Sequence, residues 1–113
     1  MSTSNGMLKG SLQTIILKLL KEKEKMYGYE ITQKVKEITS GDIKLTEGAM
    51  YPALHKMEAE GILITSTEMI DNRVRKYYSL TEEGKREVET KLTEARSFIE
   101  NLKLLLDLKM HTS

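Results

Sequence analysis

The sequence predicts a mainly α-helical fold with one β-hairpin, of the α+β class, followed by a single long helix. Three observations lead to this prediction. Between residues 8 and 61, the apolar residues recur at helical spacing in three segments. Residues 62–80 are instead rich in β-branched and aromatic residues, which favour strands. From residue 81 onward the chain contains no proline and returns to helical spacing.

The length and composition are those of one folded domain. The chain has 113 residues, of which 39% are hydrophobic and 31% charged, a mixture that favours a globular protein over a disordered one. Cysteine is absent, which excludes disulfides, thiolate zinc sites and cysteine nucleophiles and favours a reducing cytoplasm. No apolar run approaches the ~20 residues that span a bilayer. We therefore expect a cytoplasmic protein without membrane contact, metal or cofactor.

The overall charge does not by itself indicate a nucleic-acid partner. Lysine and arginine together number 18 against 17 acidic residues, which gives a net charge of +1. A DNA-binding surface would therefore require a local cluster of cations.

The first two predicted helices occupy residues 8–20 and the residues that follow Tyr29. The apolar residues of the first helix form one stripe, and they are Leu8, Leu12, Ile15, Ile16, Leu19 and Leu20. This helix ends in the polar run of residues 21–25. The second helix carries Ile31, Val35 and Ile38 at spacings of four and three, and Ser40-Gly41 supplies a left-handed stop.

The third predicted helix begins at Thr46 and ends at Gly61. Thr46 is the expected N-cap, and Glu47 lies in the first turn, where the helix dipole favours an acid. The apolar side of this helix consists of Met50, Leu54 and Met57. Pro52 lies within the segment, where it lacks an N–H group and crowds the carbonyl of Gly48, so we expect a local bend.

Residues 62–67 and 74–80 predict the two strands of a hairpin, and residues 69–72 predict the turn between them. Because side chains alternate across a strand, we expect Tyr78 in the core. Tyr77 is then expected on the outer face, together with Arg73 and Arg75.

Residues 81–109 predict one long helix. Thr81 is the expected N-cap, and Glu82 and Glu83 follow at the positive end of the helix dipole. At ~1.5 Å per residue the helix would reach about 43 Å, whereas a compact chain of this size has a radius of gyration of only ~13 Å. Part of the helix must therefore project beyond the body.

An apolar seam follows this long helix. Its members alternate at spacings of four and three, as in a heptad repeat, with two further residues that widen the seam. They are Val88, Leu92, Ala95, Phe98, Ile99, Leu102, Leu105 and Leu106. The projecting part of such a seam needs a partner, and a second copy of the chain is the simplest one. We therefore expect a homodimer.

The order of the elements is that of a winged helix-turn-helix. In this motif the second helix of the helix-turn-helix pair, which is the third predicted helix of this chain, enters the major groove of DNA. Residues 1–80 would form this DNA-binding domain, and residues 81–113 the dimerisation helix. The outward side chains of the third helix are small or polar, so its backbone could approach base edges closely. Glu47 also faces outward, and the candidate contacts on this helix are Thr46, Ala49, Tyr51, Pro52, His55 and Lys56.

The predicted hairpin carries the densest cluster of cations, and we expect no acid opposite these cations closer than Asp71. Its candidate contacts are Asn72, Arg73, Arg75, Lys76 and Tyr77. These side chains would meet phosphates or the narrow minor groove. Alternatively, the charges protect an edge strand from aggregation. Their position in a wing favours the DNA-binding interpretation.

Several ordered motifs lie between residues 8 and 84. They are Leu8-Lys9-Gly10, Tyr27-Gly28-Tyr29-Glu30-Ile31, Gly48-Ala49-Met50-Tyr51-Pro52-Ala53-Leu54, Glu58-Ala59-Glu60-Gly61-Ile62-Leu63, Arg75-Lys76-Tyr77-Tyr78 and Leu80-Thr81-Glu82-Glu83-Gly84. Through these motifs the sequence resembles the PadR-like transcriptional regulators. Several motifs in one order are far more specific than a single motif.

The resemblance implies a dimeric winged helix-turn-helix repressor that dimerises through its C-terminal helix and often responds to a small aromatic or drug-like molecule. It also implies that Tyr51-Pro52 belongs inside the DNA-reading helix. The sequence resembles the members with one long C-terminal helix and no larger effector domain. Some relatives stack a planar ligand on a tryptophan of the dimerisation helix, and this chain has no tryptophan. Phe98 is the aromatic residue available there, and we expect it to pack in the core. We also expect Gly28 and Tyr29 to serve helix packing. The resemblance thus leaves a small hydrophobic effector as a possible further partner.

Two other classes of function fit the sequence less well. An enzyme would need a nucleophile, a base and an oxyanion donor in one pocket, and no motif assembles them. His55 and Glu58 supply too few ligands for a closed metal site. The closer alternative is a winged-helix dimer that binds another protein rather than DNA, which the near-neutral charge allows.

Overall fold

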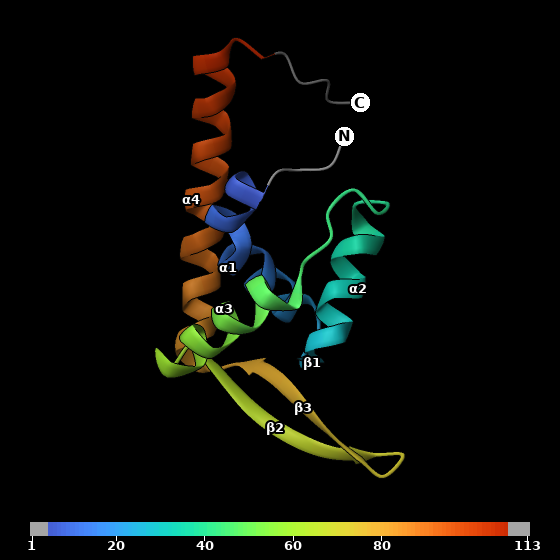
Figure 1. Cartoon of the computed structure of the whole chain (residues 1–113). Helices are drawn as coiled ribbons and strands as arrows, with labels where there is room; N and C mark the ends of the chain where they lie inside the picture. Colours follow the sequence, from blue (N-terminus) through green and yellow to red (C-terminus); the bar gives the residue numbers. More distant parts are fainter. Residues whose placement is uncertain (1–4, 109–113) are drawn as a thin grey trace.

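The computed structural model describes residues 5–108, with side chains from residue 8 onward. Its elements are α1 (Asn5–Glu22), β1 (Met26–Tyr27), α2 (Gly28–Ile38), α3 (Glu47–Ala59), β2 (Leu63–Ile70), β3 (Arg73–Leu80) and α4 (Glu82–Leu106). In Figure 1, α4 runs along one side of the body, α2 lies on the other side, and the β2–β3 hairpin projects from one end. This arrangement confirms the predicted fold class.

The helices α3 and α4 are capped as the sequence predicts. Thr46 precedes α3, and its Oγ1 accepts a hydrogen bond of 3.2 Å from the Ala49 N–H. Thr81 precedes α4 and accepts one of 3.0 Å from the Gly84 N–H. α3 continues through Pro52, although the missing N–H removes one helical hydrogen bond. The proline therefore lies inside the helix and does not end it.

The hairpin has a shorter turn than the sequence predicts. Met69 and Ile70, which were expected in the turn, belong to β2. Only Asp71 and Asn72 form the turn, with φ angles of 50° and 64°. Two consecutive residues with positive φ are typical of a two-residue turn that follows the strand twist, and Asp and Asn tolerate this conformation.

β1 is a strand that the sequence does not predict, because two residues are too few to show an alternating pattern. The sheet has the antiparallel order β1–β3–β2. β1 pairs with β3 through Met26 and Tyr78 and through Tyr27 and Tyr77. The added strand pairs with the middle of β3, and both tyrosines of β3 are buried.

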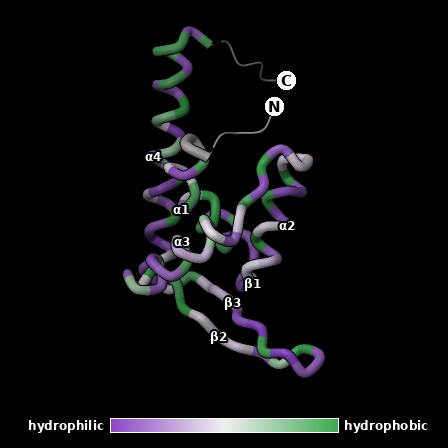
Figure 2. The backbone as a smooth tube through the Cα atoms, in the orientation of Figure 1, coloured by the Kyte–Doolittle hydropathy of each residue, from purple (hydrophilic) through white to green (hydrophobic). Residues whose placement is uncertain are grey.

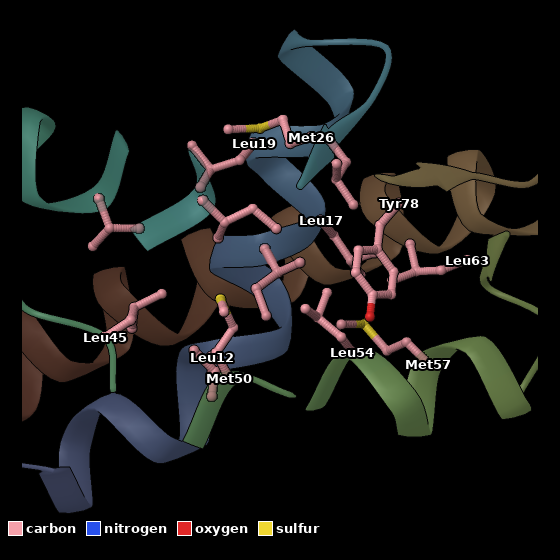
Figure 3. Packing of buried hydrophobic residues seen from close by; sticks show 14 of the residues in the cluster. Leu12, Leu17, Leu19, Met26, Leu45, Met50, Leu54, Met57, Leu63 and Tyr78 are labelled. Atoms are coloured by element: carbon pink, nitrogen blue, oxygen red, sulfur yellow. The ribbon is translucent and has the colours of Figure 1, made fainter. Parts of the chain in front are cut away.

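The hydrophobic core surrounds α1, whose Ile16 is completely buried. Figure 3 shows the ring of Tyr78 beside Leu54 and Met57 of α3 and Leu63 of β2. Tyr78 is therefore a core residue, as predicted, and its ring joins the hairpin to α3.

The first half of α4 packs on α1, and the second half projects beyond the body. The molecule measures 53 × 31 × 27 Å, and its radius of gyration of 15.4 Å exceeds the ~13 Å of a compact chain of this size. The projecting end of α4 and the hairpin lie at opposite ends of the molecule (Figure 1). α4 ends at Leu106, and the predicted end at Lys109 lies outside the described residues. Between residues 5 and 108, no helix combines the length and the apolar character that a membrane crossing requires.

Candidate nucleic-acid interface

One side of α3 is buried and the opposite side is exposed. Met50, Leu54 and Met57 lie in the core. The exposed side, which we call the outward face of α3, consists of Gly48, Ala49, Pro52, His55 and Lys56. Thr46 and Glu47 at the start of the helix are also exposed. Because the first turns of this face carry no bulky side chain, another molecule can approach the helix backbone closely.

Tyr51 is half-buried and lies against α2 rather than in the middle of the outward face. A Cβ added to Gly28, the first residue of α2, would lie 2.8 Å from the Cζ atom of Tyr51. Burial of the phenol raises the pKa of Tyr51, and the nearby charge of Glu47 adds to this effect. Gly28 therefore permits close helix packing, as expected. Tyr29, also expected to serve packing, is instead 62% exposed.

Lys76 lies on the face of the hairpin that contacts α3. Its Nζ is 3.8 Å from Oε1 of Glu58 on α3, and it lies 5.4 Å from the centroid of the Tyr78 ring. The other carboxylate oxygen of Glu58 accepts a hydrogen bond of 3.2 Å from the Thr65 hydroxyl of β2. The charge of Lys76 is therefore partly neutralised within the chain.

On the opposite face of the hairpin, three of its side chains contact two side chains from the segment around β1. We call these five residues the back-face cluster. They are Lys25, Tyr27, Glu68, Arg75 and Tyr77. The guanidinium carbon of Arg75 lies 4.2 Å from the centroid of the Tyr27 ring, and Lys25 Nζ lies 4.7 Å from that of Tyr77. The two rings meet edge to face, with centroids 5.6 Å apart and planes at 81°. A cation is attracted to the face of an aromatic ring, and two rings that meet edge to face also attract each other.

An ion pair between Lys25 and Glu68 completes the back-face cluster. The hydrogen bond between them raises the pKa of Lys25 and lowers the pKa of Glu68. Glu68 also lies directly opposite Arg75 in the strand ladder. The expectation that Asp71 is the acid closest to the hairpin cations is therefore wrong. Strand register, rather than distance along the chain, decides which side chains meet.

Tyr77 is buried, and its expected position on an outer face is wrong. It is 9% exposed, because Tyr27 of β1 and the side chain of Lys25 cover its ring. Sequence reasoning missed Lys25, Tyr27 and Glu68 as parts of this site. Their contacts depend on the pairing of β1 with β3, and the only sequence signal near it was the motif that begins at Tyr27.

Asn72 and Arg73 lie exposed at the end of the hairpin. Figure 2 shows this end as largely hydrophilic, interrupted by short apolar stretches. Met69 and Val74, which face each other across the two strands, form an exposed apolar pair there. None of the ion pairs found among residues 8–108 includes Arg73. Its charge is thus available to an external anion.

The apolar seam of α4 divides into a buried part and an exposed part. Val88 is 1% exposed and belongs to the core, and Leu92 packs against that core. The prediction that Val88 contacts a second copy is therefore wrong, since the body of the same chain covers it. The rest of the seam, half-buried to exposed, consists of Ala95, Phe98, Ile99, Leu102, Leu105 and Leu106. Leu104 and Leu108, which the seam did not include, are exposed too.

Two shallow clefts flank the body. One, of about 480 Å³, lies where the end of α1, the end of β3 and the start of α4 meet, and Leu20, Leu80 and Val88 provide its apolar part. The other, of about 520 Å³, lies between α1 and the start of α3, beside Ala49 and Pro52. In the part of the chain with described side chains, no three histidine or acidic residues gather as in a metal site.

Comparisons with known proteins identify the family. Residues 16–90 match the model of the transcriptional regulator PadR-like family. Over 77 residues the chain is 32% identical to the transcriptional regulator Rv3488 of Mycobacterium tuberculosis. The matched region covers 68% of this chain and 65% of that protein.

Solved structures give the same result. A transcriptional regulator from Clostridium thermocellum matches with a TM-score of 0.78 and 28% identity, and a PadR-like transcriptional regulator from Bacillus cereus with 0.76 and 27%. Each match covers 93% of this chain and 100% of the other. These proteins are transcriptional regulators. The fold, the motifs and these matches together show that the chain belongs to the PadR-like family of transcriptional regulators.

Proposed function

We propose that the chain is a DNA-binding transcriptional repressor that acts as a homodimer on a near-palindromic operator. The observation that carries this proposal is the exposed outward face of α3 beside a hairpin whose end bears Arg73, in a member of a family of transcriptional regulators. A helix with such a face fits the major groove, and the hairpin then serves as a wing along the neighbouring DNA backbone.

The proposed DNA contacts lie at two places in residues 1–80, the start and outward face of α3 and the end of the wing. They are Thr46, Ala49, Pro52, His55, Lys56, Asn72 and Arg73. The first-turn amides of α3 also suit a phosphate, because they lack helical partners and lie at the positive end of the helix dipole. Residues that contact their own chain hold these elements in place, and they are Tyr51, Arg75, Lys76 and Tyr77.

The projecting half of α4 is the proposed dimerisation element, within residues 81–113. Phe98, Ile99 and Leu105 continue the stripe that α4 buries against the body, and nothing in the described chain covers them. A two-fold pairing there would place the two α3 helices in successive major grooves about 34 Å apart. A dimer bound in this way at a promoter would block transcription sterically, in the cytoplasm.

A small hydrophobic effector would release the DNA by changing the spacing of the two α3 helices. Such couplings are typically about 1–3 kcal/mol. The cleft between α1, β3 and α4 suits this role, because a molecule there would touch both the wing strand and the start of the dimerisation helix.

A salt titration of duplex DNA binding tests the proposal. Each phosphate contact contributes about −0.9 to the slope of log affinity against log salt concentration. Arg73→Ala should flatten this slope by about one unit. Arg96→Ala, which removes the same charge from α4, is the matched control and should leave the slope unchanged. Absence of duplex binding, or binding that salt does not weaken, would instead favour the alternative of a protein-interaction module.

A further inference from the structure

The three cations of the wing stand in different environments, although they lie within four residues of one another. Arg73 is exposed at the wing end and takes part in none of the ion pairs among residues 8–108. Lys76 faces Glu58 of α3. Arg75 is half-buried over the Tyr27 ring in the back-face cluster. Only Arg73 therefore combines exposure with a charge that the chain leaves unpaired.

The back-face cluster marks the last place at which the wing is fixed to the body. β1 pairs with β3 only as far as Tyr27 and Tyr77. From Tyr77 toward the turn, the hairpin consists of β2 and β3 alone and projects from the molecule (Figure 1). Arg75 lies two residues closer to the turn than this last paired position, and its guanidinium lies over the ring of Tyr27 in β1. Its side chain thus joins the free part of the wing to the body.

The chemistry of Arg75 suits such a link better than a phosphate contact. A planar guanidinium stacks on an aromatic ring, which fixes its orientation, whereas a phosphate contact would require it to leave the Tyr27 ring. Glu68 lies directly opposite Arg75, so the guanidinium already has a carboxylate of its own chain beside it. Tyr77 lies under the Lys25 ammonium and against Tyr27, so the link is built from both strands and from β1.

We infer that Arg75 is a positioning residue, which stacks on Tyr27 to hold the wing at the angle that brings Arg73 and Asn72 to the DNA backbone. It does not itself neutralise a phosphate. This inference rests on the proposed DNA binding, and it assigns the two arginines of one strand face to two different tasks.

The salt dependence of binding separates these two tasks. The probe is a duplex of mixed sequence, about three helical turns long, titrated with wild-type dimer and with single variants. Arg73→Ala should flatten the salt slope by about one unit, as a lost phosphate contact does. Arg75→Ala and Tyr27→Leu should each weaken binding about threefold or more and leave the slope unchanged. The Arg75→Ala/Tyr27→Leu double variant should bind no more weakly than the weaker single variant, since each single change already removes the contact between Arg75 and Tyr27.

A second measurement tests the link without DNA. Hydrogen exchange at the Met26 and Tyr78 amides, which pair in the β1–β3 ladder, reports how firmly the wing is held. Arg75→Ala should speed this exchange severalfold, and Arg73→Ala should not change it. Circular dichroism confirms that each variant remains folded.

The two measurements distinguish failure of this inference from failure of the proposed function. If wild type does not bind the duplex, the proposed function fails, while the exchange experiment still tests the link. The inference is overturned if Arg75→Ala flattens the salt slope as much as Arg73→Ala does, if the effects of Arg75→Ala and Tyr27→Leu multiply, or if exchange in the ladder is unchanged.

Discussion

Gly28 is the residue that sets the distance between α2 and α3. Any β-carbon there would meet the end of the Tyr51 ring, 2.8 Å from Cζ. Gly28→Ala should therefore destabilise the fold by about 1–3 kcal/mol, the usual effect of overpacking. It should also displace the Tyr51 ring toward the outward face of α3. Urea unfolding at fixed protein concentration measures the first effect.

Gly10→Ala is the matched control for this prediction. Gly10 lies in α1, and an added Cβ would meet no atom within 4 Å. This variant should gain up to about 1 kcal/mol, because alanine loses less backbone entropy in a helix. Adding Tyr51→Ala to Gly28→Ala should recover part of the lost stability. Equal stability of the two glycine variants would show that the contact between Gly28 and Tyr51 is not tight.

Residue roles with local causes could be predicted from the sequence, and roles that depend on pairing could not. Thr46 and Thr81 cap their helices as expected, because an N-cap depends only on the next three residues. Tyr77 and Arg75 were assigned by alternation along one strand. Alternation does not reveal that β1 and Glu68 meet that face, so their surroundings emerged only from the strand register.

Pro52 is the feature of α3 that helix energetics does not favour. It lies inside the helix and on its exposed side, and it removes one backbone hydrogen bond. Pro52→Ala should therefore raise the stability of the protein by about 1–3 kcal/mol. If Pro52 meets base edges, as proposed, the same change should weaken binding to duplexes selected from a random pool.

The two readouts of Pro52→Ala must move in opposite directions. Thermal unfolding reports stability, and a competition assay with the selected duplex reports binding. A variant that is less stable, or that binds the selected duplex as wild type does, would contradict this account of Pro52.

At the scale of elements, long periodic segments were predicted well and short ones poorly. The four helices and the hairpin lie where spacing placed them. The two-residue strand β1 has too little sequence to show a period, and the turn was predicted too long because Met69 and Ile70 continue the ladder to Asp71. The outward face of α3 followed from the helical spacing of its buried side, except at Tyr51, which is half-buried against α2.

At the level of the whole molecule, the proposed dimer depends on the projecting end of α4. Leu105 and Leu104 are each 80% exposed, yet only Leu105 lies on the apolar seam. Leu105→Asp should convert the dimer to monomers in sedimentation experiments at micromolar concentration, because it would bury a carboxylate in an apolar interface. Leu104→Asp introduces the same charge on the other side of the helix and should remain dimeric. Identical behaviour of the two variants would mean that the seam is not the interface.

In the proposed complex, a two-fold dimer places two copies of α3 in successive major grooves of one duplex. Hydroxyl-radical footprinting on a duplex selected by the protein tests it most directly. We expect two protected segments, related by two-fold symmetry and centred about 10 base pairs apart. Leu105→Asp should weaken the protection of both segments together. A single protected segment, or even protection along the whole duplex, would contradict it.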